Sequence, residues 1–223
     1  MHYILLTLSI GFFFVIRPYF SARQQLKQLR DQSALLNDPV LLAMTAKLAR
    51  AMNIKTVMVN IYDKPEMNGL ATADGKIYMS RGFIDKYRNN EFSAAELTSV
   101  VAHEMGHIAL GHAKRRRFDF FIRDVLTATS GFFFSRFFFG FGSYAMRAVS
   151  QLFMAKLSRK DEFEADAFAT ALMHSAGLGS APQKALFAKL DRYSGKDNTP
   201  VWLRSHPKCA DRIAAIEANE ARW

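Results

Sequence analysis

The chain has 223 residues, half of them hydrophobic, which is enough for one domain with a substantial core and excludes wholesale disorder. Its formal net charge of +10 suits anionic partners, but no zinc-finger spacing, RNP motif or KH loop accompanies it, so we do not expect nucleic-acid binding. The single cysteine, Cys209, excludes an intramolecular disulfide framework.

The chain opens on an uncharged apolar stretch, residues 3–16. This stretch is short for a membrane span, and it lacks both a basic segment before it and a small-x-small cleavage site after it. Four basic residues follow the stretch instead: Arg17, Arg23, Lys27 and Arg30. By the positive-inside rule, this charge pattern holds the next domain on the cytoplasmic side. We expect residues 1–20 to be a membrane anchor; export to the periplasm competes, and a buried core helix is less favoured.

Residues 21–37 are predicted to form a polar helical linker. Asp38-Pro39 then combines a residue that caps helix N-termini with a proline suited to the first helical position. We therefore expect a helix from there to about Met52.

Two short strands are expected next. Apolar residues alternate with polar or partly polar ones between residues 57 and 61, which predicts the first strand. Residues 64–69 are predicted to be a loop. Asp74-Gly75 is a hairpin-type turn, and it introduces a second strand over residues 76–80.

A capping box marks the next helix. In Ser93-Ala94-Ala95-Glu96, the serine and glutamate side chains can each accept a hydrogen bond from the other residue's backbone N–H group. The helix that starts there is expected to run to about Ala113.

The Phe-rich residues 118–157 are interrupted by glycines and basic residues too often for a clear transmembrane span. We predict an amphipathic helical insertion, membrane-proximal or gating, that lies against lipid, a partner or the core. Its helical continuation carries residues 161–173, and two further helices are expected to begin at Pro182 and Pro207.

The helix that follows the capping box carries His103-Glu104-Met105-Gly106-His107. A spacing of four places two imidazoles on one helix face, as a zinc site requires. Glu104 is then placed to reach a water on the same metal without binding the metal itself. A metal-bound water has a pKa near neutrality, so a carboxylate can take its proton.

A catalytic zinc needs a third protein ligand and an open fourth position. The candidates are His112, His174, His206 and the carboxylates of residues 161–166. His112 is rotated well off the metal face of a continuous helix, so an ordinary polar residue near the helix end is favoured there, as it is for His174. Glu162 and Asp166 share a helix face whereas Glu164 points away. Spacing alone leaves a solvated acidic face as an equal alternative.

A family resemblance separates these alternatives. Residues 162–169, Glu-Phe-Glu-Ala-Asp-Ala-Phe-Ala, resemble the Glu-x-x-x-Asp motif of the HtpX-like and CAAX-prenyl-protease metallopeptidases. In that family the glutamate completes a His-Glu-x-x-His zinc site.

Two further segments resemble the same family. Residues 68–83 resemble the segment that enters an edge strand beside the active site, with Asn-Gly-Leu at 68–70 where many relatives have Asn-Ala-Phe. Ser-His-Pro at 205–207, together with Arg212, resembles the family's C-terminal element. The likeness spans residues 38–216 in the family's order.

The resemblance implies one zinc ion per chain, bound by His103, His107 and Glu162, with Glu104 as the general base. Asp166 would orient a histidine ligand, and His206 would help to stabilise the tetrahedral intermediate. Arg212 would pair with an acidic residue of the site such as Asp166, a purely structural ion pair being the alternative. The peptide-binding residues would be Asn68, Ile77, Tyr78 and Met79. Cys209 is expected to be inert.

We therefore expect an α+β, mainly helical metallopeptidase domain over residues 38–223, with a small β-sheet beside the active-site helix and an N-terminal anchor helix. The predicted activity is zinc-dependent endopeptidase hydrolysis, in quality control of membrane or envelope proteins. Its expected partners are polypeptides and membrane lipid, and its expected location is a bacterial inner membrane with a cytoplasmic catalytic domain, the periplasm being the alternative. A non-proteolytic membrane chaperone or adaptor with a structural metal is the competing hypothesis.

Overall fold

The computed structural model describes residues 23–24, 26–72, 74–112, 115, 141–193, 202, 206 and 208–222, without the side chains of 141–157. The predicted anchor at residues 1–20 and the Phe-rich residues 118–140 lie outside this part of the chain. Among the helices of the described residues, none has the length and hydropathy that a membrane crossing requires.

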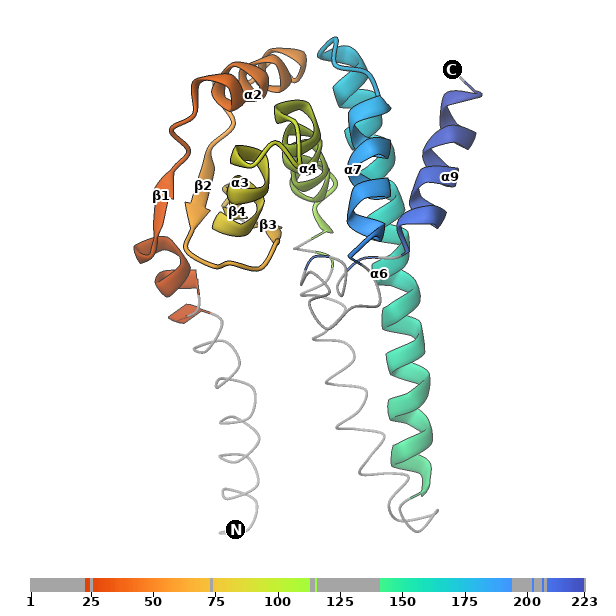
Figure 1. The fold of residues 1–223 in the computed structure, drawn as a ribbon. Helices are drawn as coiled ribbons and strands as arrows, with labels where there is room; N and C mark the ends of the chain where they lie inside the picture. The colour runs from red at the N-terminus through yellow and green to blue at the C-terminus, as the bar shows by residue number, and fades with distance from the viewer. Residues whose placement is uncertain are drawn as a thin grey trace.

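A small mixed sheet forms one side of the domain (Figure 1). Its strands are β1 (Ser33–Leu35), β2 (Val59–Tyr62), β3 (Gly69–Ala71) and β4 (Ile77–Ser80), in the order β1-β2-β4-β3. The β2–β4 pair is parallel, and the other two pairs are antiparallel. The two predicted strands are confirmed as β2 and β4.

The sheet also corrects two expectations. Residues 26–31 are helical, as predicted for the linker, but residues 33–35 of that segment form strand β1, and β3 begins at the end of the predicted loop. Because β3 pairs with the outer side of β4, the strand at residues 76–80, which contains the predicted peptide-binding residues 77–79, is interior and offers no free edge. The edge strand within the segment 68–83 is β3.

Besides the helical residues 26–31, the helices are α2 (Pro39–Ala51), α3 (Arg81–Arg88), α4 (Ala94–Ala109), α6 (Phe141–Ser175), α7 (Ala181–Asp191) and α9 (Cys209–Glu220). Asp38 caps α2 through its side chain, which accepts hydrogen bonds from the N–H groups of Val40 and Leu41. Ser93 and Glu96 form the predicted capping box of α4. Both caps are local interactions, so the sequence alone was sufficient to predict them.

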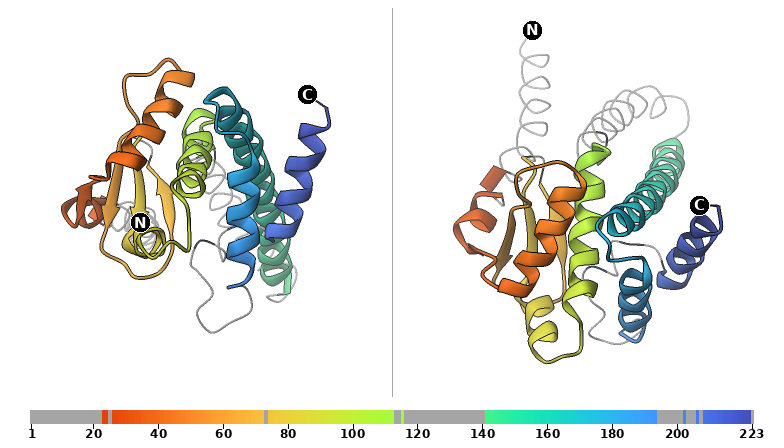
Figure 2. Two further views of the ribbon diagram at one scale, coloured as in Figure 1. Left: turned by 45° about the horizontal axis from the view of Figure 1, so that its top comes forward. Right: turned by 90° about the horizontal axis from the view of Figure 1, so that it is seen from above.

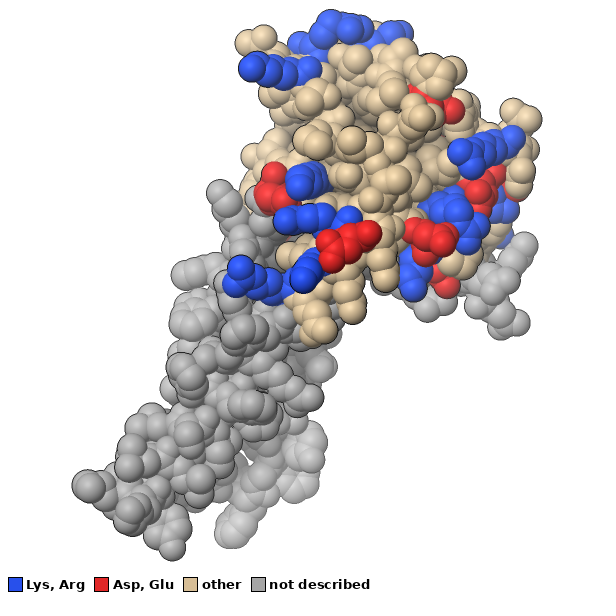
Figure 3. Space-filling view, turned by 90° about the vertical axis from the view of Figure 1, so that its left-hand side faces the viewer, with Lys and Arg blue, Asp and Glu red and all other residues tan. Residues whose placement is uncertain are grey.

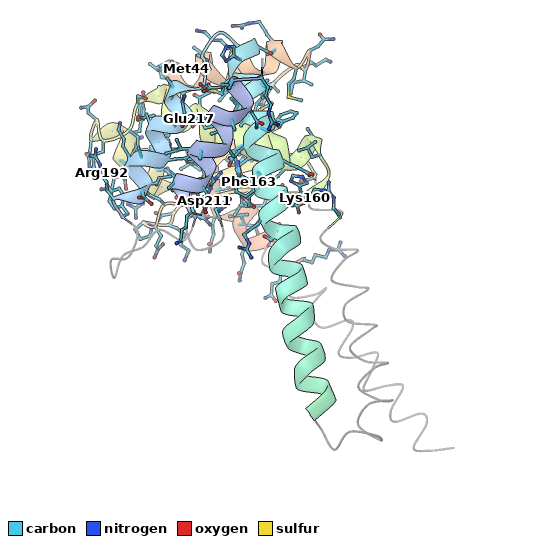
Figure 4. The ribbon with its side chains drawn as sticks, turned by 90° about the vertical axis from the view of Figure 1, so that its right-hand side faces the viewer. Met44, Lys160, Phe163, Arg192, Asp211 and Glu217 are labelled. Carbon is cyan, nitrogen blue, oxygen red and sulfur yellow. The ribbon has the colours of Figure 1, made fainter. Side chains whose placement is uncertain are left out.

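Helix α4 lies at the centre of the domain. It contacts β3 and β4 on one side and α6 and α7 on the other, and α9 covers α6 and α7 from outside (Figures 1 and 2). Asp211 and Glu217 mark α9 in Figure 4, where it lies beside the part of α6 that carries Lys160 and Phe163. The predicted fold class, a mainly helical α+β domain with a small sheet, is therefore confirmed.

The central position of α4 leaves it buried along most of its length. Residues 96–106 are all buried, including Leu97, Val100 and Val101 in the core. Gly106 permits α6 to approach closely, because a Cβ atom there would lie 3.0 Å from the Cα and carbonyl oxygen of Ala165. Without a side chain at this point, α4 and α6 bring their polar groups into direct contact.

Charged side chains of both signs lie in a band across the face of the molecule that carries β1 (Figure 3). Figure 3 views the molecule from the β1 side, where basic and acidic side chains lie next to one another around its middle. Ion pairs on the sheet side of the chain include Arg81–Asp63 and Lys86–Glu91. Such exposed pairs contribute little to stability, on the order of 1 kcal/mol or less each.

Candidate metal centre

Helix α4 brings two imidazoles together inside the protein. The Nε2 atoms of His103 and His107 lie 3.1 Å apart, as expected for residues one helical turn apart with the same side-chain direction. His103 is 1% exposed, and the side chain of His107 is 12% exposed. His103 is therefore buried, whereas His107 keeps slight exposure to solvent.

Helix α6 brings a carboxylate to the same point. Glu162 Oε2 lies 3.3 Å from His103 Nε2, and Glu162 Oε1 lies 3.6 Å from His107 Nε2. Ligand atoms around a tetrahedral zinc ion, at about 2.0–2.1 Å from it, are about 3.3 Å from one another. The spacing and the nitrogen and oxygen donors both fit a zinc ion, so these three residues could hold one.

A fourth group reaches this cluster from the C-terminal part of the chain. His206 Nε2 lies 3.0 Å from Glu162 Oε2, and the ligand atoms of His103, His107, Glu162 and His206 all lie within 4.8 Å of one another. His206 Nδ1 lies 2.5 Å from the carbonyl oxygen of Trp202. Because a carbonyl only accepts, Nδ1 carries the proton. Burial lowers the pKa of His206 to about 3, so the ring is neutral and its Nε2 atom carries a lone pair. This lone pair faces the Glu162 carboxylate, and a cation or a shared proton between the two groups removes their repulsion.

Asp166 lies behind His103. Its Oδ1 is 2.9 Å from His103 Nδ1, and Arg212 binds both of its carboxylate oxygens at 2.6 Å. Arg212 is fully buried, with its guanidinium carbon 4.1 Å from the centre of the Phe187 ring and 4.6 Å from that of Trp202. Burial opposes the Asp166 carboxylate, but the charge and hydrogen bonds of Arg212 prevail and lower its pKa to about 2.

The charges of the cluster stabilise one another. Burial opposes the imidazolium form of His103, but hydrogen bonds with Asp166 and Glu162 outweigh it and raise its pKa to about 9. Burial likewise opposes the Glu162 carboxylate, yet hydrogen bonds with His103 and His107 hold its pKa well below the ordinary range. The centre thus favours two carboxylates together with positive charge between them, which a metal cation also supplies.

Glu104 lies on α4 between the two histidines in sequence and is 3% exposed. Strand β3 approaches it closely, since a Cβ atom on Gly69 would lie 3.4 Å from Glu104 Oε1. Its carboxylate also raises the pKa of Tyr62 on β2, although burial is the largest cause of that shift. Glu104 is therefore buried against β3, the edge strand of the sheet.

Three of the four predicted peptide-binding residues lie in β4, the strand that pairs with β3. Ile77, Tyr78 and Met79 are buried in β4, at 1%, 3% and 2% exposure, and they form part of the core instead of a surface open to a peptide. Asn68 precedes β3, where its N–H group donates to Ser80 Oγ at 2.8 Å. Its backbone pairing extends the β3–β4 ladder.

The contacts of two residues near the centre were not predicted from the sequence. Trp202 stacks on His206 with ring centres 4.3 Å apart, and only its position four residues before His206 hinted at this contact. His112 is 1% exposed, and its Nδ1 atom lies 2.8 Å from Nδ1 of His107. The expectation that His112 is an ordinary polar residue at a helix end is therefore wrong. His174, by contrast, is exposed at the end of α6.

Comparisons with known proteins agree with this geometry. The model of the family described as "Peptidase family M48" matches residues 36–220. The metalloprotease YcaL of Escherichia coli (strain K12) is 31% identical over 179 residues, which cover 77% of this chain and 66% of YcaL. The metalloprotease LoiP of the same strain is 27% identical over 173 residues, covering 76% of this chain and 65% of LoiP. The chain thus spans slightly less than two thirds of these two relatives.

The protease HtpX of Pseudomonas aeruginosa (strain LESB58) is 28% identical over 226 residues, which cover 80% of this chain and 72% of HtpX. Among solved structures, the crystal structure of S. mikatae Ste24p matches with a TM-score of 0.55 at 20% identity, over 83% of this chain and 51% of that one. The structural match shows a shared fold.

Proposed function

Because the chain belongs to peptidase family M48, we propose that it is a zinc-dependent metalloendopeptidase. The observation that carries the proposal is the convergence of His103, His107 and Glu162, from two helices, at spacings suited to one zinc ion. Glu104 lies next to this cluster on α4. A purely structural metal site has no need of such a carboxylate.

In the proposed mechanism, His103, His107 and Glu162 hold the metal and Glu104 moves the proton. A bound zinc ion would act as a Lewis acid, polarising the scissile carbonyl and lowering the pKa of the attacking water. Glu104 accepts a proton from this water as its oxygen bonds to the carbonyl carbon. The same carboxyl group then donates that proton to the amide nitrogen as the carbon–nitrogen bond breaks.

His206 is proposed to stabilise the tetrahedral intermediate. Its Nε2 atom faces the same point as the metal ligands, at 3.0 Å from Glu162 Oε2. The ring is neutral at rest because burial lowers its pKa to about 3. As negative charge develops on the substrate oxygen, the imidazole takes up a proton from solvent at Nε2 and donates a hydrogen bond from it to that oxygen.

The peptide substrate is proposed to pair with β3. The carbonyl oxygen of Asn68 accepts from the N–H group of Ser80, and the N–H group of Thr72 donates to the carbonyl oxygen of Lys76. The residues directly before and after β3 therefore direct their backbone groups toward the β4 side. In an antiparallel pair, the backbone groups of the residues between them, Gly69 and Ala71, point away from β4. They can therefore bond to an extended peptide at the edge that lies beside Glu104.

We also propose that the natural substrates are misfolded membrane or envelope proteins and that the chain is attached to the membrane. The apolar residues 3–16 and the Phe-rich residues 118–157 support this proposal. The cytoplasmic side of a bacterial inner membrane is favoured by the basic residues after the apolar stretch, and the periplasm is the alternative. Protease accessibility of the C-terminus in intact vesicles distinguishes the two sides.

A test of the peptidase proposal compares wild-type protein with Glu104→Gln. Both should bind one zinc ion per chain by elemental analysis, whereas hydrolysis of a model peptide should fall at least 100-fold in the variant, the loss of a general base. Wild-type hydrolysis should also stop with a chelator and return with zinc. Full activity of Glu104→Gln would contradict the mechanism. A wild-type protein that holds zinc without cleaving any peptide would favour the chaperone or adaptor hypothesis.

A further inference from the structure

Each histidine of the metal centre uses both of its ring nitrogens. His103 directs Nε2 toward Glu162 at 3.3 Å, and its Nδ1 lies 2.9 Å from Asp166. His107 also directs Nε2 toward Glu162, at 3.6 Å, and its Nδ1 lies 2.8 Å from Nδ1 of His112. A carboxylate therefore supports one imidazole, and a second imidazole supports the other.

The end of α4 explains how His112 reaches His107. In a continuous helix, a residue five positions on is rotated away from the face of the first. Here α4 ends at Ala109, and Gly111 has a φ of +67°, a left-handed conformation that glycine adopts without strain. The Gly111 N–H group donates to the carbonyl oxygen of Ile108 at 3.1 Å. The chain turns there, and the ring of His112 becomes buried against His107.

Hydrogen-bond chemistry gives this contact a direction. An imidazole that coordinates a cation through Nε2 carries its proton on Nδ1, so His107 must donate and His112 Nδ1 must accept. His112 then carries its own proton on Nε2. That atom lies 3.2 Å from Glu164 Oε2 and 3.9 Å from Asp161 Oδ1, so a carboxylate is present to accept.

The two carboxylates are themselves held in place. Arg115 Nη1 lies 3.1 Å from Asp161 Oδ1 and 3.4 Å from Glu164 Oε2. His112, Asp161 and Glu164 are close enough together to hold a second metal ion. However, the guanidinium of Arg115 already contacts both carboxylates, and Nδ1 of His112 already faces His107. These contacts favour a hydrogen-bonded support over a second metal site.

We propose that His112 is a positioning residue that fixes the tautomer and ring orientation of the metal ligand His107. The support runs from His107 through His112 to Glu164 and Asp161, and it ends at Arg115. The inference rests on the proposed zinc site, and it adds a residue to which the sequence pattern assigned no role. Removal of such a supporting group typically weakens metal affinity by about 10–100-fold.

The test measures zinc affinity by chelator competition in three full-length variants. His112→Phe retains a ring without an acceptor, so zinc should bind about 10–100-fold more weakly. His112→Asn places an amide oxygen near the position of Nδ1, so affinity should recover to within a few-fold of wild type. His174→Phe is the matched control, because it exchanges an exposed histidine on α6 and should leave the affinity unchanged.

Glu164→Ala is the fourth variant, and it tests the same support at a side chain that is 33% exposed, in case His112→Phe fails to fold. Zinc affinity should fall several-fold in it. Wild-type affinity in His112→Phe, or in Glu164→Ala if that variant alone folds, would overturn the proposal. So would two zinc ions in the wild-type chain and one in His112→Phe, which would assign a metal to the second cluster. Peptide hydrolysis is assayed separately, so zinc affinity decides the positioning role even if no peptide is cleaved.

Discussion

Gly106 of α4 lies directly against Ala165 of α6, so that a Cβ atom on the glycine would be 3.0 Å from the Cα and carbonyl oxygen of the alanine. His107 follows Gly106, and Glu162 lies one helical turn before Ala165. The distance between the two helices therefore also sets the distance between ligands from different helices.

Gly106→Ala should consequently weaken both the fold and the zinc site. The added methyl group forces the helices apart by a few tenths of an ångström, at a cost of about 1–3 kcal/mol. The higher helix propensity of alanine offsets up to about 1 kcal/mol of this. Thermal unfolding with and without zinc measures both effects. Ala109→Leu adds bulk at an exposed position of α4 and should change neither; unchanged zinc affinity in Gly106→Ala would contradict the prediction.

The helices of the fold were predictable because their signals are local. Asp38-Pro39 and the box from Ser93 to Glu96 place the starts of α2 and α4 through contacts within one turn. Strands β1 and β3 have three residues each, too few for a periodic pattern, and they exist because β2 and β4 offer them partners. Their pairing is non-local, so the sequence contains no direct sign of it.

The residues of the site also divide into those with a local signal in the sequence and those without one. The spacing of His103 and His107 predicts one face of a helix, and the motif at residues 162–166 predicts Glu162. His112 was missed because the helix was expected to continue to Ala113, and a continuous helix would have turned it away. The left-handed residue Gly111 ends the helix earlier and reverses this conclusion.

Ala71→Pro tests the proposed edge for substrate pairing. Proline removes an N–H group that points away from β4, so one hydrogen bond to an extended peptide is lost, at about 1 kcal/mol. KM should rise several-fold, whereas zinc content and kcat should stay close to wild type. Leu70→Ala, which retains every backbone N–H group of the strand, serves as the control. An equal KM in wild type and Ala71→Pro would exclude pairing at this residue.

The ion pair of Asp166 and Arg212 should make the zinc-free protein sensitive to acid. The pKa of Asp166 is lowered from 3.8 to about 2, so its ionised form stabilises the fold above pH 4. That contribution, about 2 kcal/mol, is lost as the pH falls from about 4 through 2. Urea denaturation at a series of pH values should show the loss.

Arg212→Met leaves the Asp166 carboxylate buried without its guanidinium partner. The variant should be destabilised by about 3–5 kcal/mol at neutral pH. The double variant Asp166→Asn/Arg212→Met should recover much of this stability but not the zinc affinity, because the amide supports His103 less strongly than a carboxylate. Full recovery of zinc affinity in the double variant would argue for a purely structural ion pair.

Cys209 should be unreactive in the folded protein. The thiol is 1% exposed, and burial raises its pKa from 9.0 to about 11. The raised pKa of the thiol therefore contributes to the stability of the fold below pH 9, and this contribution is lost as the pH rises through 11. Alkylation by iodoacetamide at pH 8 should be at least about 100-fold slower than in urea, since the thiolate is the reactive form. Equal rates in both conditions would contradict the buried position.

The ligands of the metal centre lie on either side of the segment between α4 and α6. A cation bound to His107 and Glu162 closes that segment into a loop, in the manner of a covalent cross-link. The entropy of closing a loop depends only weakly on its length, and each doubling costs about 0.6 kcal/mol. Insertions or deletions after Arg115 and before α6 should therefore be tolerated in chains of this fold, since the bound cation holds the two ends of the loop together.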